Sequence, residues 1–421
     1  MIIMINDSLN NYMFQFIKDI CDEIGPRESG TEQEILAGDK IEQEMQKFCD
    51  STHQEEYVSS PHAFLGGIRY GALLALISIG LYWFSLLIDL AVLPLPMIYS
   101  FLFIMVAAVL IVITISYFIT EVMKYHEFFD FLFPKRTSKN IIGTINPENE
   151  IKHTIIFSAH HDSQFEFNTF YHFKRFGQVI INFGYLGVGI LFIITIVKLI
   201  FHLINFEFNV LFLAFGIFFL AFIPIAFAYI FFHSYKPVLG AFDNLSGVSV
   251  ILGIGKFLSE NKNSEYYPKH TRVYLISFAG EEAGLRGSKR YIEAHLKELR
   301  ENPTHIVNMD GIAKKDILEI LMKEPGIGVT HDPKIFEPIY QIAKNVNPLT
   351  NLGKLPFGAT DAAAFSKKGI PATTIGGLNL SETLAPYYHT RLDTPKVIEK
   401  EALGQVVEIC VKYLNHVDKG I

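Results

Sequence analysis

Several short stretches of the sequence place carboxylate and imidazole side chains where a strand or helix is expected to begin or end. The stretches are His160-His161-Asp162, Asp243-Asn244-Leu245-Ser246-Gly247, Glu281-Glu282, Asp310-Gly311 and Tyr388-His389-Thr390. Such side chains bind divalent metal ions and transfer protons. Each stretch taken alone is equally typical of a turn, a helix N-cap or a solvated acidic loop. Their number and their shared setting favour a metal site.

The residue types favour zinc, which binds histidine nitrogen and carboxylate oxygen. The adjacent pair Glu281-Glu282 cannot be buried as two anions without a cation or a shared proton. Two zinc ions that share one carboxylate lie about 3.5–4 Å apart and hold a water molecule between them, and a nearby glutamate can accept its proton. The expected chemistry is hydrolysis by such a metal-bridged water.

Alternating strands and helices are expected to position these stretches. The strands are predicted at residues 154–157, 272–278, 305–308 and 371–375, and the helices at residues 248–258, 288–300, 333–343 and 401–416. This alternation predicts an α/β fold with a mixed, mostly parallel sheet and helices on both faces. In such sheets, sites form at the carboxyl ends of the strands, where most of the stretches fall.

Four uncharged apolar runs interrupt this pattern. They span residues 71–88, 97–120, 177–197 and 210–232, in a chain that is 50% hydrophobic with a mean hydropathy of +0.28. At 1.5 Å per residue, helices of these lengths reach about 27–36 Å, enough to cross a hydrocarbon core of about 30 Å. Buried core helices are the alternative. We predict four transmembrane helices, arranged as two hairpins in a lipid bilayer.

The runs divide the chain into five segments. Residues 67–122 and 176–234 are the expected hairpins, with Lys198 and Glu207 placed in the connection of the second. Residues 1–66, 123–175 and 235–421 are the expected parts of one α/β domain that contains the metal-binding stretches. Because each insertion crosses the membrane twice, all three parts can fold together on one side of it.

In their order along the chain, the motifs resemble peptidase family M28, the zinc metallopeptidases that include aminopeptidase Y and the bacterial leucyl aminopeptidases. The opening stretch, residues 24–30 with the sequence IGPRESG, is similar to the first helix and loop of that family too. The resemblance covers the polar segments and excludes the four apolar runs. It implies a zinc-exopeptidase-like fold, two zinc ions per chain and a peptide substrate. Members of the family remove an N-terminal residue from a peptide, and some act on a C-terminal glutamate or on dipeptides.

The resemblance also implies roles for the matching residues. Asp243 would bridge both zinc ions, with His160 and Asp310 completing one site and Glu282 and His389 the other. Glu281 would be the general base, and then the acid that protonates the leaving amine. Asp162 would orient His160.

Two further residues are left open. Asp361, in Gly358-Ala359-Thr360-Asp361, resembles a family segment near the substrate pocket, but it is equally typical of a helix N-cap at the surface. His161 lacks the His-x-Asp spacing and is expected to be a neighbour of the site.

Two other functions remain possible from the sequence. A glutaminyl cyclase shares this fold and several ligands but uses one zinc ion, whereas Asp243-Asn244 followed by Ser246-Gly247 favours the two-zinc peptidases. A non-catalytic membrane receptor or scaffold on a peptidase fold would be expected to have lost ligands, and every ligand position is kept here.

The charge pattern bears on partners and orientation. A net charge of −7 argues against a nucleic-acid partner, because such proteins present a basic face. Basic residues flank the apolar runs mainly on the peptidase side: Arg69, Lys124, Lys135, Arg136, Lys139, Lys174, Arg175 and Lys236. The positive-inside rule then predicts a multi-pass membrane protein with its catalytic domain in the cytoplasm.

Overall fold

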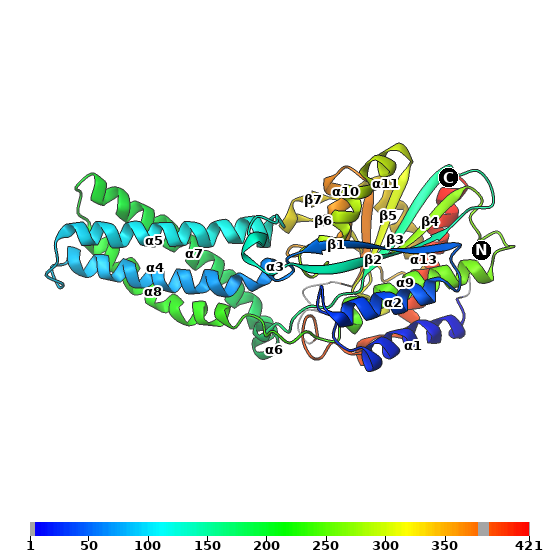
Figure 1. Cartoon of the computed structure of the whole chain (residues 1–421), viewed down its shortest axis with the longest axis horizontal. Helices are drawn as coiled ribbons and strands as arrows, with labels where there is room; N and C mark the ends of the chain where they lie inside the picture. The colour runs from blue at the N-terminus through cyan, green and yellow to red at the C-terminus, as the bar shows by residue number, and fades with distance from the viewer. Residues whose placement is uncertain (1–4, 378–386, 421) are drawn as a thin grey trace. The chain divides into compact units, whose positions relative to one another are not determined.

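The computed structural model describes residues 5–377 and 387–420 of the chain. These residues form two compact units. Unit 1 contains Met1–Pro61, Phe133–Glu166 and Tyr235–Ile421, and unit 2 contains His62–Leu132 and Phe167–Ser234. Each unit is therefore assembled from segments that are separated in the sequence (Figure 1).

Unit 1 is built on a nine-stranded sheet with the order β1-β2-β4-β3-β5-β9-β6-β7, in which β8 pairs with β6. The strands are β1 (Ser51–Ser59), β2 (Arg136–Ile145), β3 (His153–His160), β4 (Thr271–Phe278), β5 (Thr304–Asp310), β6 (Glu319–Glu324), β7 (Val329–Thr330), β8 (Asn351–Lys354) and β9 (Ala372–Gly376). The four central strands, β4, β3, β5 and β9, are parallel. Antiparallel pairs flank them on both sides. The mixed sheet with a parallel centre agrees with the prediction.

Helices cover both faces of this sheet, as the alternating pattern predicts. The helices of unit 1 are α1 (Asp7–Glu23), α2 (Glu32–Met45), α9 (Ser246–Glu260), α10 (Arg286–Glu301), α11 (Pro333–Val346), α12 (Asp361–Lys367) and α13 (Lys400–Asp418). Figure 1 shows α1, α2, α9 and α13 together on one side of the strands. On the other face α10 packs against β1 and β2, and α12 against β3, β5 and β9.

The main core lies between the central strands and α9, α13 and α1. β3 is buried along almost its whole length, as is typical of a central parallel strand. Ile155 and Phe157 on β3 are fully buried, as are Val250 and Ile254 on α9. This packing fixes the carboxyl end of β3 and the start of α9, which both bear residues of the predicted site.

Unit 2 contains six helices among its described residues. They are α3 (His62–Gly66), α4 (Ile68–Asp89), α5 (Met97–Tyr117), α6 (Asn168–Phe173), α7 (Arg175–Leu203) and α8 (Asn209–Ile230), and a π-helical turn (Phe118–Met123) extends α5. The four long helices, α4, α5, α7 and α8, form two hairpins that pack against each other. Lys198 lies within α7, where it is buried and pairs with Asp89 at the end of α4. Its placement in a connecting loop was therefore wrong, because this ion pair allows the helix to continue through Leu203.

Within the part of the chain that the structure describes, five helical segments are long and apolar enough to cross a membrane, one more than predicted. The fifth, Ala241–Glu260, contains α9, and 94% of its most apolar window is buried inside the protein. For the four helices of unit 2 the buried share is 17–44%. Length and composition therefore select five segments, and burial separates the core helix α9 from the other four.

Candidate metal centre

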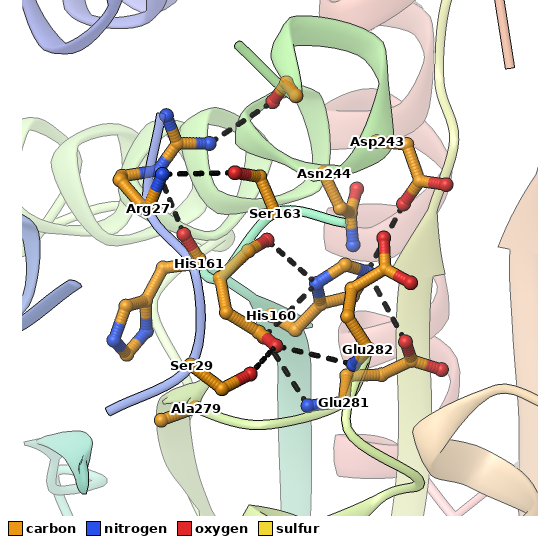
Figure 2. Close-up of polar contacts among 12 residues, drawn as sticks. Arg27, Ser29, His160, His161, Ser163, Asp243, Asn244, Ala279, Glu281 and Glu282 are labelled. Atoms are coloured by element: carbon orange, nitrogen blue, oxygen red, sulfur yellow. Dashed lines mark hydrogen bonds and ion pairs between the residues drawn. The ribbon is translucent and has the colours of Figure 1, made fainter. Parts of the chain in front are cut away.

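Three parallel strands bring their carboxyl ends to one place in unit 1. β3 ends at His160 and β5 at Asp310, while β4 ends at Phe278, just before Glu281 and Glu282. Asp243 lies in the turn before α9, next to the end of β5. Figure 2 shows Asp243 and Glu281 facing the imidazole of His160. The sheet therefore collects residues that are far apart in the sequence.

The five predicted metal ligands form two groups that share Asp243. In the first group, His160 Nε2 lies 3.2 Å from Asp243 Oδ1 and 3.8 Å from Asp310 Oδ1. In the second, His389 Nε2 lies 3.0 Å from Asp243 Oδ2 and 3.1 Å from Glu282 Oε1. The two carboxylate oxygens of Asp243 thus face different histidines. Within each group, the possible ligand atoms all lie within 4.8 Å of one another.

Asn244 explains why the Asp243 motif has its particular residue types. Its side-chain amide donates to Met309 O at 2.8 Å, and its carbonyl oxygen accepts the N–H groups of Gly247 and Gly311. These bonds tie the start of α9 to the end of β5. A Cβ on Gly247 would lie 2.6 Å from Met309 O, so this close approach requires glycine. The Asp243–Asn244 peptide bond is cis.

Asp162 connects β3 to the loop after β4. Its carboxylate accepts the backbone N–H groups of Glu281 and Glu282 at 3.2 and 3.1 Å, and the hydroxyl of Ser29 at 2.6 Å. Its Oδ1 atom lies 3.4 Å from Nδ1 of His160. Asp162 therefore holds the backbone of Glu281 and Glu282 in addition to lying beside His160, which a His-x-Asp spacing alone does not indicate.

His161 turns away from the metal-binding groups. Its ring lies 3.1 Å from Glu34 Oε1 and 2.9 Å from Ser277 Oγ, and all of its atoms are buried. Glu34, which also accepts from Ser138 and from the N–H of Gly30, was not singled out in the sequence. Its position in the first turn of α2 offered no signal, because acidic residues are common at helix starts.

Arg27 is a buried residue that the sequence did not assign to the site. Its guanidinium donates to four backbone carbonyls, those of Gly25, His161, Leu239 and Gly240, at 2.8–3.2 Å. Its own N–H donates to the Ser163 hydroxyl (Figure 2). These bonds join the entry loop to the strand end of β3 and to the segment before Asp243. The sequence signal for this role of Arg27 was its place in the motif at residues 24–30, because a buried arginine needs hydrogen-bond partners.

The burial of many acids at one place raises several pKa values. Burial raises the pKa of Glu282 to about 7 and that of Asp310 to about 6. Burial also raises the pKa of Glu281 well above its usual value, and Glu282 and Asp310 add to the rise. For His389, burial lowers the pKa, but Glu282 and Asp243 outweigh it and raise the pKa to about 10. The site therefore gathers more carboxylates than basic groups, and without a cation these carboxylates retain protons to higher pH than free ones do.

This donor set fits zinc. The Nε2 atom of His160 makes no hydrogen bond to the described residues, although three carboxylates lie within 3.9 Å of it. An unsatisfied buried nitrogen next to buried carboxylates is the arrangement that a divalent cation completes. The shared carboxylate of Asp243 gives each of the two groups one histidine and two carboxylates, all of them zinc ligands.

Three more residues lie next to these groups. Asp361 is the first residue of α12 and is fully buried, so its reading as a surface N-cap was wrong; burial raises its pKa to about 7. Asp393 accepts the backbone N–H groups of Phe242 and Asp243 at 2.6 and 3.1 Å. The ring of Tyr388 stacks on His389 at 3.8 Å between centroids.

Comparison with known proteins finds a family match over part of the chain. Residues 227–414 match the profile of peptidase family M28. Over 177 residues, 40% of this chain, the sequence is 29% identical to aminopeptidase YwaD of Bacillus subtilis (strain 168), and the match spans 36% of that protein. The chain thus spans about a third of the length of this curated relative.

Solved structures show the same fold at low identity. A Zn-dependent exopeptidase from Parabacteroides distasonis superposes with a TM-score of 0.54 at 13% identity, over 98% of this chain and 99% of the other. A zinc aminopeptidase from Bacillus subtilis gives 0.52 at 15%, over 98% and 95%. A glutaminyl cyclase from Bacteroides thetaiotaomicron gives 0.55 at 13%, over 96% and 97%. The likeness therefore extends to both enzyme classes considered from the sequence.

Proposed function

Because residues 227–414 match the profile of peptidase family M28, we propose that the chain is a membrane-bound two-zinc metallopeptidase that removes N-terminal residues from peptides. The observation that supports this most is the pair of ligand groups sharing Asp243. One group contains His160 and Asp310, and the other Glu282 and His389. One carboxylate that faces two separate histidines suits two ions better than one.

In this proposal, His160, Asp243, Glu282, Asp310 and His389 would hold zinc, which would supply Lewis-acid polarisation of the scissile carbonyl and a more acidic attacking water. Glu281 lies beside His160, with Oε2 at 3.9 Å from Nε2, and forms a third possible ligand group with His160 and Glu282. Its carboxylate accepts a proton from water and later gives it to the departing amine. Asp162 accepts the backbone N–H of Glu281 and thereby fixes the position of the backbone from which the Glu281 side chain extends.

The four long helices of unit 2 are proposed to cross a lipid bilayer as two hairpins. Their spans are 22–28 residues long, with mean hydropathies of 2.1–2.8. Many large apolar side chains on them are exposed, among them Ile77, Phe84, Val109, Ile193 and Ile217. Polar side chains such as Ser78, Ser100 and Lys198 are buried instead. Apolar residues outside and polar residues inside suit a bundle whose solvent is lipid.

The basic residues that flank the apolar runs lie mainly on the side of the peptidase domain, and the positive-inside rule therefore favours a cytoplasmic location for this domain. Protease treatment of sealed vesicles tests this orientation. In vesicles that enclose the cytoplasmic face of the membrane, we expect the catalytic unit to be cleaved only after the vesicles are opened. Cleavage of the catalytic unit in sealed vesicles of that orientation would contradict it.

Hydrolysis tests the activity directly. Purified protein is assayed on a panel of aminoacyl-chromogenic substrates, their N-blocked forms and a peptide with N-terminal glutamine. We expect release from free aminoacyl substrates, loss of activity after chelation and recovery with zinc. Cyclisation of the glutamine peptide without aminoacyl hydrolysis would support the cyclase and contradict the peptidase.

A further inference from the structure

The two ends of the second insertion lie on one short ribbon within unit 1. The ribbon consists of residues 163–166, just before the insertion, and residues 235–238, just after it. Phe165 pairs with Pro237 in an antiparallel bridge. The N–H of Glu166 donates to Lys236 O, and the N–H of Val238 donates to Gln164 O, both at 2.9 Å. We call this pair of segments the root ribbon.

One side chain of the root ribbon contacts Glu282 directly. The amide nitrogen of Gln164 donates to Glu282 Oε2 at 3.0 Å and to Glu282 O at 2.9 Å. The amide oxygen of Gln164 accepts the N–H of Phe165, so the orientation of this amide is fixed by its own backbone. The side chain is buried. Gln164 therefore holds one carboxylate oxygen of Glu282 while the other faces His389.

A second side chain of the root ribbon fixes the loop that contains His389. Glu166, with a side chain only 5% exposed, binds the guanidinium of Arg391 through two parallel bonds of 2.7 Å. Glu166 Oε1 also accepts the backbone N–H of Arg391 at 3.2 Å. Arg391 lies two residues after His389. A two-bond pair of this kind sets orientation as well as position.

Resting on the proposed two-zinc function, we propose that Gln164 and Glu166 are positioning residues for one half of the metal centre, the half formed by Glu282 and His389. The other half, His160 and Asp310, lies on the ends of β3 and β5. The two metal sites thus have different supports. Loss of a ribbon side chain weakens one zinc site selectively.

Zinc affinity measured by competition with a chromogenic chelator tests this on the full-length protein. The variants are Gln164→Met, which keeps the side-chain length, Glu166→Gln and Arg391→Lys, which keeps the charge but loses the fork. We expect each to weaken one of two zinc equivalents by about 10–100-fold, as is usual when a partner of a metal ligand is removed. The other equivalent keeps its affinity.

Two control variants make the same chemical changes elsewhere in unit 1. Gln54→Met removes an amide that donates to Asp39 and Glu42, and Glu44→Gln neutralises the carboxylate paired with Lys47. Both controls are expected to bind zinc like the wild type. Thermal unfolding of the metal-free proteins is measured alongside, since a merely structural role lowers the unfolding temperature without separating the two zinc equivalents.

The outcomes separate this inference from the proposed function. Wild-type competition curves in Gln164→Met and Arg391→Lys, or an equal loss of both equivalents, would overturn the role of the root ribbon. A wild-type protein that binds a single zinc ion would contradict the proposed function instead. Selective weakening of one equivalent in the ribbon variants, with unchanged controls, supports the inference.

Discussion

The carboxylate of Asp162 accepts the backbone N–H of Glu282 at 3.1 Å. A residue at the end of β3 therefore positions a residue that follows β4. The same carboxylate accepts the N–H of Glu281. The proposed base and a proposed metal ligand thus share one support, so that the acidic loop is held by a buried anion and does not depend on solvent. A cation at the centre balances the like charges that this arrangement brings together.

Replacing Asp162 with asparagine tests this support. Asparagine carries no charge and has one side-chain oxygen, so one of the N–H groups of Glu281 and Glu282 loses its acceptor and the other keeps only an uncharged one. We expect zinc affinity and hydrolysis both to fall by about 10–100-fold. Asp418→Asn is the matched control, because Asp418 also accepts two backbone N–H groups, those of Lys269 and His270. Unchanged zinc affinity in Asp162→Asn would show that this carboxylate is not needed.

Arg27→Met is expected to destabilise the fold. The substitution removes the guanidinium donor from four backbone carbonyls, two of the bonds being buried and two partly buried, and each hydrogen bond to a charged group contributes about 1.5–3 kcal/mol. We expect a loss of about 3 kcal/mol or more in the free energy of unfolding, measured by denaturant titration of the detergent-solubilised protein. The control Arg300→Met removes an exposed arginine that donates to Lys368 O and should change stability little. Equal stability of the two variants would contradict the structural role of Arg27.

The metal-free protein is expected to lose stability as pH rises from about 5 to 8. Glu282 and Asp310 keep protons in the folded state up to about pH 7 and about pH 6, whereas unfolded carboxyls lose them near about pH 4. His389 stays protonated up to about pH 10 when folded, against about 6.5 when unfolded. The folded state therefore binds more protons across this range, and raising the pH favours unfolding. The lowered pKa of Asp243 acts only in more acidic solution.

Zinc should reverse this trend, because its ligands bind it in their deprotonated forms. At a free concentration of 100 times its dissociation constant, an ion that binds only the folded state adds about 2.7 kcal/mol. Unfolding temperatures are measured at several pH values with chelator and with zinc. The gap between the two curves should widen as pH rises. A chelated protein whose unfolding temperature increases from about pH 5 to 8 would refute the prediction.

The strand ends were the most predictable part of the site. His160 and Asp310 follow apolar runs rich in β-branched residues. Such runs are typical of buried parallel strands. The long helices of unit 2 were equally clear, because an uncharged run of that length is rare in other settings. α9 was predicted as a helix, yet its composition alone also fits a membrane span. Only its burial against the sheet distinguishes it.

Contacts between distant segments could not be predicted. Arg27 donates to carbonyls 134 and 212 residues away in the sequence, and nothing local indicates them. Lys198 was expected in the connection of the second hairpin, because its pairing with Asp89 depends on how the two hairpins pack. Gln164 and Glu166 lie in a loop whose composition is ordinary. Their partners become apparent only when the root ribbon closes beside Glu282 and Arg391.

The metal content and activity of Glu281→Gln test the central claim most directly. The wild-type protein and the variant are purified with zinc, freed of loosely bound metal, and assayed for zinc per chain and for aminoacyl hydrolysis. Glu319→Gln is the control, since Glu319 is a half-buried glutamate outside the site whose pKa is also raised by burial. We predict two zinc ions per chain in all three proteins, with activity lower by about 10²–10⁴-fold in Glu281→Gln alone. One zinc ion per wild-type chain, or a Glu281→Gln variant as active as the wild type, would contradict the two-zinc peptidase.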